Sequence, residues 1–160
     1  MSNHPSKSLT IYFILALVLL IKPGFCAPEL TKLQKQARIY RTQGYEMQKQ
    51  GNLDAALSYY QKALTLDPGY VAAYNDAGVI FEAKGQLEEA GKMYLKAIEI
   101  EPGYPNSYSN LAFLYEQKKD YANALLCWMK RIELSVFLAD NLWAEAAKKH
   151  IEDIALLYPE

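Results

Sequence analysis

The residue types that most often perform catalysis or bind metals are sparse in this chain. His4 and His150 are its two histidines, and Cys127 has no His–Asn or His–Asp pair to activate its thiol. Glu88 and Glu89 are adjacent carboxylates, but neighbouring helix positions point in different directions. No G-x-G-x-x-G, P-loop or H-E-x-x-H motif is present. We therefore expect no enzyme, no metal and no cofactor.

The amino-terminal segment has the layout of a secretory signal peptide. Residues 9–21 are apolar or nearly so, Lys7 precedes them, and a Lys-Pro-Gly sequence at 22–24 ends the run. A helix of this length spans about 20 Å, which is less than the roughly 30 Å hydrocarbon core of a bilayer. We therefore expect residues 1–26 to be a signal peptide, with a retained membrane anchor as the alternative.

Three kinds of processing fit this segment. Cleavage after Cys26 puts Gly24 and Cys26 where small residues are favoured, whereas cleavage after Ala27 puts Phe25 there. A lipoprotein site would also use Cys26, but Phe25 disfavours it. We expect the protein to be exported, either periplasmic or secreted, or else membrane-anchored through residues 9–21.

Charge and cysteine content narrow the classes of partner. Loss of residues 1–26 would remove Lys7 and Lys22, leaving 15 basic and 18 acidic side chains. This near-neutral mixture gives no electrostatic footprint for nucleic acid. Cys127 would then be the single cysteine, so the mature chain could form no internal disulfide. Nucleic acid is therefore not an expected partner.

Two stretches 34 residues apart begin almost alike, DPGYVAAYNDAG from Asp67 and EPGYPNSYSNLA from Glu101. Aligned at this period, the chain has three segments: 37–70, 71–104 and 105–138. Small residues recur at the eighth and twentieth positions, and aromatic residues recur at the fourth and twenty-fourth. Small residues let two helices approach closely, and aromatic side chains fill the surrounding space.

Glycine and proline mark the ends of the expected helices. Gly51 and Gly85 divide the first two segments, because glycine adopts the left-handed conformation that ends a helix. Pro68 and Pro102 end the second halves, since the residue before proline avoids helical geometry. The pattern predicts antiparallel pairs at 37–50 with 53–66, 71–84 with 87–100, and 105–118 with 121–135.

The two ends of the array depart from this pattern. Residues 27–36 are expected to extend the first helix from just after Pro28. In the third segment Lys119, Arg131 and Val136 replace the turn glycine, a small residue and a proline, which places this segment near the end of the array. Residues 139–160 are predicted to form a capping helix with one apolar face.

These segments resemble tetratricopeptide repeats (TPR), a family of 34-residue helix–turn–helix units. The resemblance is carried by YxxxGxxF at 74–81, GQLEEA at 85–90, YLKA at 94–97 and Pro102, and it covers residues 37–138. It implies an all-α, right-handed solenoid of antiparallel helix pairs, with about three units and a C-terminal capping helix. Such repeats bind proteins rather than catalyse reactions.

The resemblance also implies a binding site, because the first helix of each pair lines a concave groove in this family. Arg38 and Arg41 would pair with an acidic stretch, the asparagines would bond a peptide backbone, and Tyr45, Val79 and Phe113 would offer apolar contact. The groove residues are expected to be Arg38, Arg41, Tyr45, Asn75, Val79, Glu82, Asn106, Ser109, Asn110 and Phe113.

One known binding mode of the family is not expected here. Members that bind the C-terminal carboxylate of cytosolic chaperones use a Lys and Asn four apart, then an Asn, then a Lys and Arg four apart. The matching places hold Arg41 and Tyr45, then Asp76, then Asn106 and Asn110. Asp76 would repel a carboxylate.

The sequence as a whole predicts an exported adaptor or assembly factor that takes a peptide or helix in its groove. The alternative is a structural protein that self-associates through the convex face or the terminal helix. An enzyme of unrecognised type is the third interpretation, and no group of residues supports it.

Overall fold

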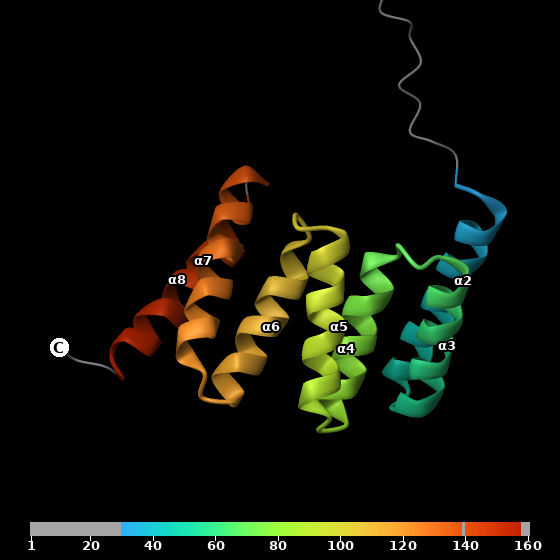
Figure 1. Ribbon diagram of the computed structural model, residues 1–160, viewed down its shortest axis with the longest axis horizontal. Coiled ribbons are helices and arrows are strands. Elements are labelled where there is room, and N and C mark those ends of the chain that lie inside the picture. Colours follow the sequence, from blue (N-terminus) through green and yellow to red (C-terminus); the bar gives the residue numbers. More distant parts are fainter. Residues whose placement is uncertain (1–29, 139, 158–160) are drawn as a thin grey trace, which may run out of the picture. The chain divides into compact units, whose positions relative to one another are not determined.

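The regular structure of this chain consists of α-helices that pair with their neighbours in sequence. The computed structural model describes residues 30–138 and 140–157, and residues 31–160 form one compact unit. No strand occurs in the described part, which confirms the predicted all-α fold (Figure 1). The helices are α2 (Lys32–Lys49), α3 (Leu53–Leu66), α4 (Val71–Ala83), α5 (Leu87–Ile100), α6 (Pro105–Gln117), α7 (Tyr121–Phe137) and α8 (Asn141–Ala155).

Two helix ends differ from the prediction for local reasons. Helix α2 begins at Lys32 rather than just after Pro28, because Thr31 and Gln34 form a capping box in which each side chain accepts from the other's backbone N–H. Helix α7 runs to Phe137, two residues beyond the expected end. Val136 stands where the other segments have proline, so nothing stops the helix there.

The turns within the pairs use the left-handed backbone region. Gly51 and Gly85 have φ of 76° and 73°, and Lys119 occupies the equivalent place in the third pair with φ of 60°. A residue other than glycine costs about 1 kcal/mol in this region. The third pair therefore keeps the same turn in spite of the substitution, as the sequence indicated.

Each of the first two helix pairs is held by a ring that packs directly on a glycine. A Cβ atom added to Gly44 would lie 2.6 Å from the Tyr60 ring, and one added to Gly78 would lie 2.4 Å from the Tyr94 ring. Both tyrosines are fully buried. The small residues of the sequence pattern thus set the distance between the two helices of a pair.

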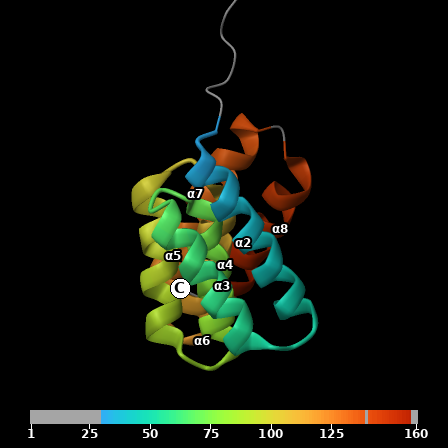
Figure 2. The same ribbon diagram turned by 90° about the vertical axis from the view of Figure 1, so that its right-hand side faces the viewer.

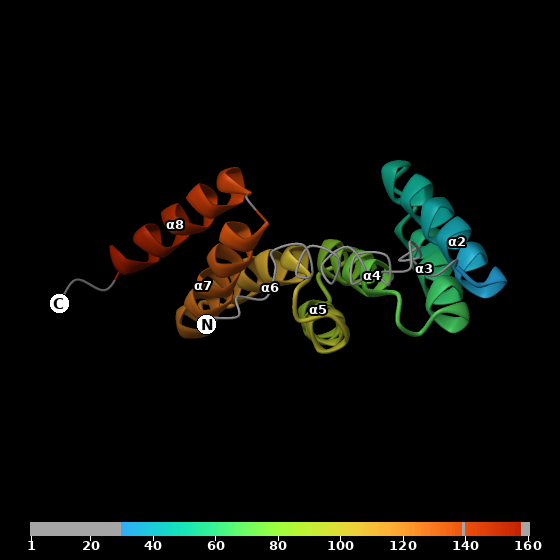
Figure 3. The same cartoon turned by 90° about the horizontal axis from the view of Figure 1, so that it is seen from above.

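Successive pairs pack side by side in chain order. Helices α2 and α3 run antiparallel (Figure 2), and α2 contacts α4, which in turn contacts α6. Helix α5 lies beside α4 and α6, to one side of the row that these two helices form (Figure 3). Two ion pairs with identical spacing join neighbouring pairs of helices, Lys84 with Asp54 and Lys118 with Glu88. The first helices therefore share one face, which we call the α2–α4–α6 face.

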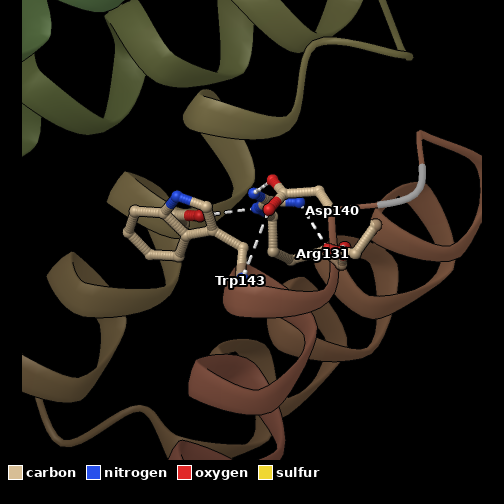
Figure 4. Close-up of polar contacts among 5 residues, drawn as sticks. Arg131, Asp140 and Trp143 are labelled. Carbon is tan, nitrogen blue, oxygen red and sulfur yellow. Dashed lines mark hydrogen bonds and ion pairs between the residues drawn. The ribbon is translucent and has the colours of Figure 1, made fainter.

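The last helix is joined to the array by a buried arginine. Arg131 is 1% exposed, and its guanidinium donates to Ser109 Oγ (3.2 Å), Ser135 Oγ (2.5 Å) and Asp140 Oδ2 (2.7 Å). It also lies 5.2 Å from the ring centre of Trp143 (Figure 4). Asp140 in addition caps α8. The arginine that departs from the repeat pattern therefore connects α6, α7 and the start of α8.

No helix among residues 30–138 and 140–157 is long and apolar enough to cross a membrane. The apolar segment at 9–21 and the expected cleavage sites lie outside the described residues. The signal peptide or anchor therefore stays a prediction.

The ring-on-glycine contact predicts opposite effects for two Gly→Ala changes. Gly78→Ala should lower the free energy of unfolding by about 1–3 kcal/mol, because the new methyl group overpacks the Tyr94 ring. Gly91→Ala is the matched control inside α5, where the nearest atom is 4.0 Å away. It should raise the stability by up to about 1 kcal/mol through helix propensity. Equal stabilities of the two variants in urea denaturation would contradict this account.

The Arg131–Asp140 contact predicts an acid-sensitive end of the array. The hydrogen bond from Arg131 lowers the pKa of Asp140 below its ordinary value of 3.8. This contribution to stability is therefore complete above that value and is lost as the pH falls through the lowered pKa.

Asp140→Asn should keep the helix cap but lose the charge, so the variant should be less stable at neutral pH and lack this acid-dependent loss. Asp153→Asn, an exposed change on α8, is the control and should retain it. The free energy of unfolding, followed by tryptophan fluorescence against pH, checks both. An unchanged pH profile in Asp140→Asn would contradict the role of the ion pair.

Candidate functional site

The residues expected to line a groove all lie on α2, α4 and α6, but they divide into two groups. The first group consists of polar side chains that already bind to other residues of the chain. The second group consists of side chains that remain at least partly exposed. The division depends on contacts between repeats, so we describe these contacts first. Positions are counted from residues 37, 71 and 105.

Polar side chains at the fifth and sixth positions pair across neighbouring repeats. Arg41 Nε donates to Asp76 Oδ2 at 2.6 Å, and Asn110 Nδ2 donates to Asn75 Oδ1 at 2.9 Å. Ser107 Oγ also donates to Asn75 Oδ1, at 3.3 Å, and Asn75 is only 6% exposed. Asn75 and Asn110 thus join α4 to α6, and the Asn75 carbonyl is occupied before any peptide arrives.

The basic end of the face is correspondingly smaller than the sequence indicated. Burial by itself would lower the pKa of Arg41, but the hydrogen bond and the charge of Asp76 outweigh burial and raise it. The guanidinium groups of Arg38 and Arg41 lie 5.9 and 5.8 Å from the ring centre of Tyr70. Arg38 is exposed, whereas Arg41 is partly buried against Asp76. Arg38 is therefore the arginine better placed to meet a ligand.

A third set of contacts ties the twelfth position to the aromatic residue at the twenty-fourth. The ring hydroxyl or indole N–H donates to the polar side chain twelve residues earlier in every repeat. The pairs are Tyr60 with Gln48 (2.8 Å), Tyr94 with Glu82 (2.8 Å) and Trp128 with Glu116 (2.5 Å). Burial, followed by the bond to Glu82, raises the pKa of Tyr94. Glu82 therefore bonds within its own helix pair, as does Ser109, which is buried and accepts from Arg131.

The side chains that remain accessible are mostly those at the second and ninth positions. Tyr45 is 51% exposed and Phe113 is 38% exposed. Val79, the ninth residue of the middle repeat, is partly buried. Arg38 and Asn106 are exposed at the second position. A hollow of about 210 Å³ lies beside Arg41, Thr42 and Tyr45. We call Tyr45, Val79 and Phe113 the apolar stripe of the α2–α4–α6 face.

Sequence reasoning missed that α8 contributes to this region. The His150 ring stacks on Trp128 with centres 4.5 Å apart, and it meets the Phe113 ring edge-on at 4.9 Å. His150 Nδ1 also lies 3.2 Å from Glu116 Oε1. The sequence identified His150 only as one of the two histidines. Its position beside the stripe depends on how α8 packs, which the repeat period does not determine.

No residue of the described part stands out as a nucleophile or a metal ligand. Burial raises the pKa of the Cys127 thiol to about 11, so the thiol is protonated at neutral pH. Cys127 packs against the apolar clusters of the second and third repeats, as expected of a small apolar side chain. Within the described residues, His, Cys, Asp and Glu form no group of three that could hold a metal ion.

Comparison with protein families and solved structures gives a consistent result. Two family models, each described as tetratricopeptide repeat, match residues 41–105 and 93–125. A crystal structure of MamA is similar with a TM-score of 0.62 and 27% identity, over 65% of this chain and 61% of that chain. The chain thus spans less than two thirds of the MamA chain. No curated protein matches the sequence.

Other similar structures share the fold at lower identity. The TPR2B domain of yeast Sti1, in complex with an Hsp70 peptide, has a TM-score of 0.70 and 18% identity, over 79% of this chain and 99% of that chain. The first TPR domain of Spaghetti (RPAP3), bound to an HSP90 peptide, has a TM-score of 0.67 and 19% identity, over 76% and 95%. The helix pairs over residues 41–125 of this chain are therefore tetratricopeptide repeats, and the all-α fold is a solenoid of such units.

Proposed function

We propose that this chain is a protein-interaction module, an adaptor or assembly factor that takes a segment of another protein on the α2–α4–α6 face. The observation that carries the proposal is the apolar stripe. Tyr45 and Phe113 stay exposed on helices of the same face, while most polar side chains between them are bonded to each other. An apolar stripe within a satisfied polar surface is typical of a binding site rather than of a solvated helix face.

The polar contacts make such a face ready to bind before a ligand arrives. Arg41 is fixed by Asp76, and Asn75 by Asn110 and Ser107, so these side chains lose little freedom when a ligand docks. Ordering of interface side chains costs about 0.5–1.5 kcal/mol each, and a preformed face avoids part of this cost. Apolar side chains of a peptide or helix would lie along the stripe, and Arg38 would pair with an acidic residue beside it.

The ligand we propose is not the C-terminal carboxylate of a chaperone. The similar domains of Sti1 and Spaghetti are complexes with Hsp70 and HSP90 peptides. In this chain, Arg41 at one matching place is bonded to Asp76 at the next. This ion pair puts a carboxylate where the carboxylate-binding members have an asparagine, and that carboxylate would repel a ligand carboxylate, so an internal segment of the partner fits better.

Site-specific photo-crosslinking tests where the partner binds. A photoreactive phenylalanine analogue at position 113 should capture a partner in cells, because the native ring is exposed within the stripe. The same analogue at Leu95, which is 50% exposed on α5, is the control and should capture far less. Equal capture from both positions would contradict binding on the α2–α4–α6 face.

Two substitutions separate the apolar and charged contributions to this capture. Tyr45→Ala should weaken capture severalfold, whereas Ile39→Ala should not, although both side chains are 51% exposed on α2. Arg38→Glu should also weaken capture and reduce its salt dependence, because an exposed ion pair is screened by salt. Lys92→Glu on α5 is the charge control. If Arg38→Glu left capture and its salt dependence unchanged, the proposed contact with an acidic residue would be contradicted. The proposed role of the apolar stripe would not be affected.

We further propose that the protein acts outside the cytosol and that residues 9–21 direct its export. The length of this apolar segment and the break at 22–24 support a cleaved signal, with a retained anchor as the alternative. The mass of the purified chain should correspond to loss of residues 1–26. An intact chain in the membrane fraction would indicate the anchor, and an intact chain in the cytosol would contradict export.

A further inference from the structure

The outward face of α7 carries exposed apolar side chains at helical spacing. Leu126 is 64% exposed, Met129 60%, Val136 75% and Phe137 86%. Intervals of three, seven and one residues place them on one side of the helix. The opposite side carries Ala124, Trp128 and Arg131, which are buried. The outward face of α7 is defined below as these four apolar residues together with Lys130 and Glu133.

At the four corresponding positions the preceding repeats carry a single exposed apolar residue, Leu95 of α5. The positions of Leu126 and Met129 are occupied in α3 by Ser58 and Gln61, and in α5 by Lys92 and Leu95. The positions of Val136 and Phe137 hold a Pro-Gly turn in both earlier repeats, at 68–69 and 102–103. Repeat packing therefore does not require apolar residues at these places, so another contact must explain them.

The charged residues at the centre of the face indicate what that contact is. Lys130 and Glu133 form an ion pair of 2.7 Å, with side chains 36% and 67% exposed. Two apolar residues precede this pair and two follow it. The order along the helix is thus apolar, charged and apolar from either end. Lys130 and Glu133 are equidistant from the centre of the face, and so are Leu126 and Phe137.

We propose that this chain self-associates through the outward face of α7, with two copies packed antiparallel about a two-fold axis. When two α7 helices cross with the point between Arg131 and Ile132 on the axis, Lys130 of each copy lies opposite Glu133 of the second copy. The same alignment sets Leu126 opposite Phe137 of the second copy. A two-fold interface requires one surface to complement itself, and this face does so in its central charges and in the pairing of Leu126 with Phe137.

A second copy explains the face better than other occupants do. A lipid surface would bury the apolar residues but would leave the central ion pair without a counterpart in the bilayer. The face also lies opposite the core-facing side of α7 and not on the α2–α4–α6 face, so self-association leaves the apolar stripe accessible. The proposal is therefore independent of the partner proposed for that face.

A charge-exchange experiment on the full chain tests the proposal. Wild type should show reversible dimers in sedimentation velocity over a concentration series. Lys130→Glu and Glu133→Lys should each weaken the dimer at least about tenfold, because each puts like charges opposite one another. The double exchange should restore the dimer. An equimolar mixture of the two single variants should also dimerise, since one then presents two acidic residues and the other two basic residues.

Apolar variants provide the matched control. Leu126→Ser, which installs the residue of the first repeat, should weaken the dimer, whereas Leu95→Ser on α5 should not. Both sites are exposed, so neither change should unfold the chain, and circular dichroism checks this. Wild type that remains monomeric at every concentration would overturn the proposal. So would single charge variants that dimerise as well as wild type, or a mixture that does not.

Discussion

The contact between an aromatic ring and a residue with little or no side chain determines much of this structure. In the first two helix pairs the ring lies so close to the glycine that a Cβ atom would clash with it. This contact therefore sets the distance between the two helices. The third pair replaces glycine by Ala112 and tyrosine by Trp128, which pack within one core cluster. Because the ring is fixed, its polar end is fixed as well, and it reaches the same acceptor position of the first helix in every repeat.

This constraint extends outward to the candidate binding face. The two contacts between neighbouring repeats use the same positions, so a side chain at the fifth position meets one at the sixth position of the next repeat. The polar residues of the face are thereby used for cohesion, and the residues left for recognition are fewer and more apolar than a list of groove positions implies. Recognition here would rest on shape and apolar contact, with charge at one end.

The sequence predicted the fold well because the helix pairs depend on local and periodic features. Glycine, proline and aromatic positions predicted the helix spans to within a few residues, and Lys119 kept the turn of the missing glycine. The same reasoning could not predict that Asn75 and Arg41 are occupied, because their partners lie about one repeat away and meet them only through the packing of successive pairs. The contact of His150 with Phe113 depends on how α8 packs, and the three-helix contacts of Arg131 involve a residue that departs from the repeat pattern, so the period predicts neither. The outward face of α7 was not predicted either, although Leu126 stands where the earlier repeats have Ser58 and Lys92, because its exposure follows from the packing of α7.

Arg131 also limits where this array could have lengthened by duplication. The first two repeats carry Ala63 and Ala97 at its position, so a copied unit inserted between them would meet neighbours of its own kind. A unit inserted after the third repeat would separate the buried guanidinium from Asp140 and Trp143 and leave a charge without its partners. The arginine therefore makes the junction between the third repeat and α8 unlike the junctions between the earlier repeats.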